Sequence, residues 1–210
     1  TDTAAGIGCR FMTSYHGMAH QGDVGNGEDV VVHGLGGIGL SAVHIADALG
    51  ANVIGVDLME EKLEKAESLG AVDTVNAEEV DDPAKEVRDM TDGGADVSVD
   101  ALGIATTCQN AVNSLGKGGR HVQIGLTTSE EQGMVSLPTD EFVAKEIEFV
   151  GSLGLQPSRY PEMLNMIEAG KIDPTELVSE TIDIHHIPDR LEAMTDFGTM
   201  GIPVCNDFTS

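Results

Sequence analysis

Three glycines in the first part of the chain have a spacing that could bind a diphosphate. Gly34, Gly36 and Gly39 of the segment GLGGIG fit the pattern G-x-G-x-x-G. In that pattern the first glycine permits a tight turn, the second lets the backbone approach a pyrophosphate, and the third lets a helix pack closely on a strand. The residues predicted to bind the diphosphate are Gly34, Leu35, Gly36, Gly37, Ile38 and Gly39.

The surroundings of this loop favour a nucleotide site over an ordinary strand-to-helix turn. The apolar run VVVH precedes the loop, a helical pattern follows it, and Asp57 ends the next apolar run, 18 residues after Gly39. A dinucleotide-binding fingerprint has this context, and its acidic residue accepts hydrogen bonds from the ribose hydroxyls. Because a carboxylate repels the 2′-phosphate of NADP, and no arginine directly follows Asp57, the predicted coenzyme is NAD.

The rest of the chain alternates short apolar runs with amphipathic stretches. Strands are expected at 30–33, 52–56, 71–75, 95–99, 121–125 and 147–152. Helices are expected at 37–50, 60–70, 82–90, 106–116 and 160–170, and an acidic helix is expected ahead of the last strand. Repeated alternation of this kind predicts an α/β fold of the Rossmann type, a doubly wound parallel sheet in a three-layer arrangement.

The two ends of the chain depart from this alternation. Residues 1–22 are expected to form a helix ahead of the first strand. Residues 174–210 hold a strand-like run at 176–184, a short helix at 187–194 and a last strand near 201–205. The predicted organisation is one dinucleotide-binding domain at 23–173 with a pendant segment at each end.

The net charge is strongly negative and restricts the environment and the partners. The chain has 36 Asp and Glu residues against 11 Lys and Arg residues, a formal net charge of −25. Disorder is disfavoured because 40% of the residues are hydrophobic and their spacing is periodic. We expect a halophilic protein adapted to molar salt, which screens surface carboxylates, in preference to an ordinary acidic protein. The same charge argues against a nucleic-acid partner.

Localisation is predicted from two weaker signals. No apolar run approaches the length of a membrane span, and the start of the chain lacks the basic and apolar regions of a secretion signal, so no membrane partner is expected. The three cysteines, Cys9, Cys108 and Cys205, are odd in number and widely spaced. They predict free thiols in a reducing cytoplasm.

Residues 30–77 resemble a known dehydrogenase family. Short-chain dehydrogenases need Tyr-x-x-x-Lys, but Ala19 stands four residues after Tyr15, and Leu164 four residues after Tyr160. The stretch VVVHGLGGIGLSAVHIADALGANVIGVDLMEEKLEKAESLGAVDTVNA is instead similar to the coenzyme domain of the zinc-dependent medium-chain alcohol dehydrogenases. The resemblance covers essentially the whole chain.

That family also carries a G-C-x-x-x-T motif upstream of the loop, and the resemblance assigns roles to its residues. Gly8, Cys9 and Thr13 match the motif, with Cys9 25 residues before Gly34. Cys9 would be the last protein ligand of the catalytic zinc, and Thr13 would lie against the nicotinamide. Lys62 would hold the adenosine ribose beside Asp57. The stretch that would touch the nicotinamide from the other side is Ile124, Gly125 and Leu126. The next strand end, which would lie near the nicotinamide, is matched by Gly151, Ser152 and Leu153.

The chain lacks other parts of that family's pattern. It has no G-H-E segment and no cluster of cysteines, which the family carries in a GroES-like catalytic domain ahead of this region. The resemblance therefore implies the C-terminal, coenzyme-binding part of a longer enzyme, with residues 1–22 and 174–210 as the connections to the catalytic domain. Such a chain would bind NAD but be inactive alone, and zinc would be bound only in the full-length enzyme.

The implied parent reaction is hydride transfer between NAD and a zinc-bound alcohol, or the corresponding aldehyde or ketone, in a homodimer or homotetramer. Within the same superfamily a polyol or threonine dehydrogenase and a zinc-free quinone reductase are alternatives. A non-catalytic NAD-binding module is the alternative from another class.

Three further residues leave their roles open. His16 and His20 have the i, i+4 spacing that can hold a metal, although a solvated helix face explains them more simply. Arg10 could reach the coenzyme phosphates or pair with a local carboxylate.

Overall fold

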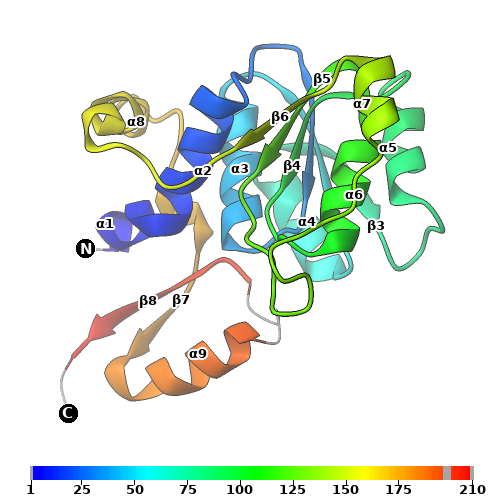
Figure 1. Cartoon of the computed structure of the whole chain (residues 1–210). Coiled ribbons are helices and arrows are strands. Elements are labelled where there is room, and N and C mark those ends of the chain that lie inside the picture. Colours follow the sequence, from blue (N-terminus) through cyan, green and yellow to red (C-terminus); the bar gives the residue numbers. More distant parts are fainter. Residues whose placement is uncertain (1, 196–199, 209–210) are drawn as a thin grey trace.

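Six parallel strands form the centre of the molecule (Figure 1). The computed structural model describes residues 2–195 and 200–208. The strands are β1 (Asp29–His33), β2 (Asn52–Asp57), β3 (Ala71–Asn76), β4 (Ala95–Asp100), β5 (Leu115–Gln123) and β6 (Glu148–Gly151). They lie in the order β3-β2-β1-β4-β5-β6. The direction of winding therefore reverses between β1 and β4, which is where ligands bind in open α/β sheets.

The inner strands are continuous apolar runs because both faces of the sheet are covered. Val31 of β1 pairs with Ile54 of β2 on one side and with Ser98 of β4 on the other. Val30 and Val32 point to the opposite face from Val31, since side chains alternate along a strand, and all three valines are fully buried. Parallel sheets covered on both faces show this pattern.

Helices cover both faces of the sheet (Figure 1). The main helices are α3 (Gly37–Ala48), α4 (Glu60–Ser68), α5 (Pro83–Met90), α6 (Ala105–Asn113), α7 (Thr139–Lys145) and α8 (Tyr160–Glu168). Leu40 of α3 and Leu63 of α4 belong to the larger core, on the Val30 face. Val87 of α5 packs with Val31 in a smaller core on the other face. The fold is the expected three-layer Rossmann arrangement.

The N-terminal segment is a kinked helix that packs on α3. It consists of α1 (Asp2–Gly6), a π-helical stretch at Ile7–Phe11, α2 (Met12–His16) and a second π-helical stretch at Gly17–Gln21. Gly8 makes the kink, with ψ −165°. Ser14 of α2 donates a hydrogen bond to the carbonyl of Ile38 at 2.8 Å, so this segment is tied to the start of α3.

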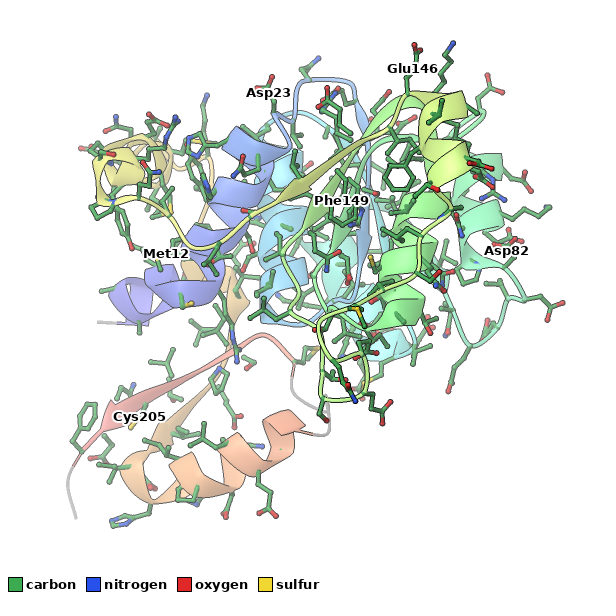
Figure 2. The ribbon with its side chains drawn as sticks, viewed as in Figure 1. Met12, Asp23, Asp82, Glu146, Phe149 and Cys205 are labelled. Carbon is green, nitrogen blue, oxygen red and sulfur yellow. The ribbon has the colours of Figure 1, made fainter. Side chains whose placement is uncertain are left out.

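The C-terminal segment forms a small separate sheet. Strands β7 (Val178–Asp183) and β8 (Ile202–Asp207) pair in parallel, with α9 (Ile187–Thr195) beside them. Figure 1 shows these elements apart from the six-stranded sheet, and in Figure 2 Cys205 lies on β8 far from Phe149 on β6. The strands and helix expected here are confirmed, whereas the domain boundaries after residues 22 and 173 remain predictions.

The predicted boundaries around β5 are wrong, since the strand expected at 121–125 spans Leu115–Gln123. The helix expected at 106–116 ends at Asn113, and β5 already begins at Leu115. Leu115 is fully buried and pairs with Ala95, so tertiary packing converts the end of the helical pattern into strand. In the described part of the chain, no helix has the length and apolar character needed to cross a membrane.

Candidate functional site

A cleft of about 550 Å³ opens at the carboxyl ends of β1, β2 and β4. The residues that line it from the glycine loop and the end of β2 are Gly34, Gly36, Gly37, Ile38, Val56, Asp57, Leu58, Met59 and Lys62. The cleft lies at the point where the winding of the sheet reverses, between α3 on one face and α6 on the other. The structure therefore brings the predicted glycine loop, Asp57 and Lys62 together in one concave site.

The three glycines of the motif are required for three different reasons. Gly34 has φ +88°, a left-handed conformation that glycine adopts without strain. Gly36 is extended, and a Cβ built on it would meet nothing within 4 Å, so its backbone faces open space. A Cβ on Gly39 would lie 1.9 Å from the carbonyl oxygen of Gly34, so Gly39 is needed for helix packing. Gly36 is thus the glycine whose environment is left for a ligand.

Asp57 joins the glycine loop to the end of β2. Its Oδ2 accepts a hydrogen bond from the Leu35 amide at 2.7 Å, and its Oδ1 accepts from the Leu58 amide at 2.9 Å and from the Met59 amide at 3.2 Å. Lys62 Nζ lies 3.5 Å from Oδ1, and the side chains of Lys62 and Asp57 are 8% and 9% exposed. The carboxylate therefore shapes the loop as well as lining the cleft. Leu35 itself is buried in the core and reaches the site only through its amide.

The opposite wall of the cleft was not predicted from the sequence. It consists of Ala101, Leu102, Ile104, Thr106, Thr107 and Asn110, from the turn after β4 and the start of α6. Asp100 is fully buried at the end of β4. Its Oδ1 accepts hydrogen bonds from the amides of Leu102 and Gly103 and from the Thr107 hydroxyl, at 2.9–3.0 Å. The signal in the sequence was an aspartate directly after the apolar run 95–99, as Asp57 follows the run 52–56.

His33 is a second residue that sequence reasoning missed. It ends β1, lines the cleft and is almost fully buried, with Nε2 3.2 Å from the Ser114 hydroxyl. Burial, with a smaller contribution from His121, lowers the pKa of His33 to about 3. His33 is therefore neutral at physiological pH and serves the cleft as an uncharged polar group.

The residues expected near a nicotinamide ring lie outside this cleft but close to one another. Thr13 is buried on α2, and Gly17 follows one turn later, with its amide bonded to the Thr13 carbonyl. A Cβ on Gly17 would lie 2.7 Å from Ile124 Cδ1 and 3.7 Å from Ser152 Oγ. The structure thus places α2 beside the carboxyl ends of β5 and β6.

Ser152 and its neighbours differ in exposure. Ser152 is 7% exposed, and its Oγ is buried without a hydrogen-bond partner among the described residues. Leu126 and Leu153 are 79% and 83% exposed. Gly125 is in close contact with the turn after β4, since a Cβ on it would lie 2.3 Å from the Gly103 amide. The three backbone turns after β4, β5 and β6 are therefore adjacent.

The described residues do not assemble a metal site. Cys9 is an exposed free thiol, and nowhere in residues 2–195 and 200–208 do three or more His, Cys, Asp or Glu side chains gather in a way that could hold a metal ion. His16 Nδ1 lies 3.1 Å from His20 Nδ1, but His20 Nε2 pairs with Glu162 at 2.8 Å. His20 therefore ties the extension of α2 to α8, and its side chain is 11% exposed, so the solvated helix face expected for the two histidines is wrong for His20.

Comparison with known proteins places this site in a family. A family model described as zinc-binding dehydrogenase matches residues 37–169. The chain is 32% identical over 200 residues to an NAD-dependent alcohol dehydrogenase of Sulfurisphaera tokodaii, covering 94% of this chain and 56% of the relative. It is 29% identical over 191 residues to alcohol dehydrogenase class-2 isozyme 2 of Oryctolagus cuniculus, covering 90% of this chain and 50% of the relative.

A solved structure gives the same result for the fold. The alcohol dehydrogenase TADH from Thermus sp. ATN1 superposes with a TM-score of 0.85 at 28% sequence identity, covering 95% of this chain and 56% of that chain. The chain spans about half the length of the curated relatives it matches. Since the family model matches more than half of the chain and includes the end of the glycine loop, Asp57 and Lys62, the chain belongs to the zinc-binding dehydrogenase family.

Proposed function

We propose that this chain binds NAD as the coenzyme-binding part of an oxidoreductase that transfers a hydride between NAD and a zinc-bound alcohol or carbonyl substrate. The observation that carries the proposal is the cleft in which an open Gly36 backbone, the N-terminus of α3 and the Asp57 carboxylate face the same space. The relatives named as NAD-dependent alcohol dehydrogenases support the choice of coenzyme and reaction.

The adenosine diphosphate half of NAD fits the residues of the cleft. The amides at the start of α3 would bind the diphosphate, because a helix N-terminus offers unpaired N–H groups and a partial positive charge. Asp57 Oδ2 accepts one hydrogen bond from Leu35, which leaves that oxygen a second lone pair for a ribose hydroxyl. Leu58 and Ile104, on opposite walls, offer apolar surface to the adenine.

The nicotinamide half would lie at the turns after β5 and β6. We propose that Thr13 contacts the ring from one side and that Ile124, Gly125, Leu126, Ser152 and Leu153 border it from the other. The buried Ser152 hydroxyl without a partner supports this assignment, because a buried polar group normally completes its hydrogen bonding with a ligand or with water. When bound, the nicotinamide supplies the hydride acceptor of the reaction.

Cys9 is proposed as one ligand of a catalytic zinc, but these residues do not fit a complete zinc site. A catalytic zinc takes three protein ligands, and the described residues provide no such group. We therefore propose that this chain alone binds NAD without catalysing hydride transfer. The exposed position of the Cys9 thiol is compatible with a ligand that is completed by residues from elsewhere.

We also propose a homodimer or homotetramer formed through the outer edge of β6. This strand is last in the order of the sheet, and Phe149 on it is 42% exposed although it stacks on His121 with ring centroids 4.6 Å apart (Figure 2). An uncovered edge strand with an exposed aromatic side chain is a template for pairing with another chain.

The charge of −25 supports a further proposal, that the protein works in molar salt. The free thiols of Cys9, Cys108 and Cys205 are compatible with a reducing compartment such as the cytoplasm.

One calorimetric experiment tests the coenzyme and the salt proposals. The chain is titrated with NAD and then with NADP, in molar potassium chloride and again in low salt, with thermal unfolding recorded in both. We expect saturable NAD binding in high salt, weaker NADP binding, and loss of the fold in low salt. Tighter binding of NADP would contradict the role given to Asp57, and a fold that is equally stable in low salt would refute the salt adaptation.

A further inference from the structure

A cationic side chain lies across the glycine loop. Arg10, in the π-helical stretch Ile7–Phe11, lines the cleft together with Gly36 and Gly37. Its Nη1 donates a hydrogen bond to the carbonyl of Gly201 at 2.9 Å. The half-buried guanidinium is therefore held between the loop and the residue that precedes β8.

The fourth glycine of the loop is explained by this side chain. The pattern G-x-G-x-x-G makes no demand at position 37. A Cβ on Gly37 would lie 2.6 Å from Arg10 Cδ, 2.9 Å from Arg10 Nη1 and 3.0 Å from the Gly201 carbonyl oxygen. Glycine at this position thus lets Arg10 lie against the loop. Since Gly37 is the first residue of α3, the guanidinium is beside the helix end that attracts anions.

We propose that Arg10 binds the diphosphate of the coenzyme, an inference that rests on the proposed NAD function. A guanidinium has N–H donors in a planar arrangement that matches phosphate oxygens. Among the described residues, the Arg and Lys side chains that line the cleft are Arg10 and Lys62, and Lys62 lies beside Asp57 at the ribose end. Arg10 is the cation at the loop end.

The charge of the whole chain makes such a cation important. A dinucleotide carries two negative charges on its diphosphate and approaches a protein with a net charge of −25. Local positive charge in a concave site opposes that repulsion. Burial lowers the pKa of Arg10 because it disfavours the charged form, and a bound anion would offset this cost.

The test compares ligands with and without a diphosphate. ADP-ribose and adenosine are titrated calorimetrically into the wild-type chain, Arg10→Ala, Arg10→Lys and the control Arg159→Ala. The control removes the same charge from an exposed position at the start of α8 that does not line the cleft. We expect Arg10→Ala to weaken ADP-ribose binding roughly 10- to 100-fold and to leave adenosine binding unchanged. Arg10→Lys should recover part of the loss, and Arg159→Ala should change neither ligand.

A second variant separates binding from folding. Gly37→Ala keeps the guanidinium of Arg10 but displaces it, so this variant should weaken ADP-ribose binding. In the Arg10→Ala background the same substitution should weaken binding less, because no guanidinium is left to displace. Absence of ADP-ribose binding by the wild-type chain would refute the proposed NAD function. Normal wild-type binding with an unchanged affinity in Arg10→Ala would overturn the role of Arg10 alone. Equal losses for adenosine and ADP-ribose, with a lower melting temperature, would also overturn it, because Arg10 would then be structural.

Discussion

Gly36 and Gly39 belong to one motif, but the structure predicts that the same substitution has opposite consequences at the two positions. Gly36→Ala adds a methyl group that meets nothing within 4 Å, at φ −79° and ψ −165°, where alanine is unstrained. The free energy of unfolding should therefore change by less than about 1 kcal/mol, with any gain coming from the unfolded chain. The methyl group projects where the diphosphate would approach the backbone, so we expect NAD affinity to fall at least about tenfold.

Gly39→Ala should instead damage the fold. Its methyl group would lie 1.9 Å from the Gly34 carbonyl oxygen, so α3 and the loop must separate by well over an ångström. Overpacking against backbone, which no rotamer change relieves, costs about 3 kcal/mol, and the helix propensity of alanine returns at most about 1 kcal/mol. A net loss of about 2 kcal/mol lowers the melting temperature by about 4–8 °C for a chain of this size.

Calorimetric titration with NAD and thermal unfolding, both in molar potassium chloride, distinguish the two variants. Gly25→Ala is the matched control, because a Cβ there makes ordinary contact with Glu28 at 3.6 Å and Gly25 does not line the cleft. We expect the control to change neither quantity. Full NAD affinity in Gly36→Ala would show that the diphosphate does not lie on this loop, and an unchanged melting temperature in Gly39→Ala would refute the packing argument.

Three further predictions concern the coenzyme, pH and assembly. Asp57→Asn removes the charge that repels a 2′-phosphate, so the ratio of NAD affinity to NADP affinity should fall at least about tenfold. An unchanged ratio in paired titrations would contradict the proposal that Asp57 selects NAD. Burial lowers the pKa of His33 from 6.5 to about 3, so the unfolded state binds more protons between these values. The free energy of unfolding due to neutral His33 is therefore complete above pH 6.5 and falls by about 1.4 kcal/mol per pH unit as the pH drops towards 3. Denaturant unfolding at several pH values should show a flatter pH dependence in His33→Asn. Phe149→Glu places a charge on the edge of β6, so light scattering should show monomers in place of a dimer, while NAD affinity stays unchanged. A dimer that persists in this variant would mean that the interface lies elsewhere.

The glycine loop and its acidic partner were predictable because their signals are local. Gly34, Gly36 and Gly39 are close in sequence, and each is required by a turn, an open backbone or a helix contact within a few residues. Asp57 was found because parallel strands in a βαβ unit end at the same edge, so the end of the second strand must lie beside the first loop. The alternation of apolar runs and amphipathic helices determined the fold class for the same reason, since it depends on local periodicity.

The second wall of the cleft depended on tertiary structure. Which strand lies beside β1 is decided by long-range packing, and only the observed order of the sheet brings β4 there, with Leu102 and Ile104 facing the glycine loop. Burial of His33 likewise depends on α6, which supplies the Ser114 hydroxyl at its end.

The role of Arg10 remained open in the sequence for the same physical reason. Arg10 contacts both Gly37 and Gly201, and Gly201 is 191 positions away in the chain. A local sequence pattern cannot predict such a contact. The sequence by itself determined that a glycine-rich loop opens a helix and that an acid ends the next strand beside it. The tertiary structure decided which side chains enclose that loop, because enclosure is made by elements that are distant in the chain and adjacent only after folding.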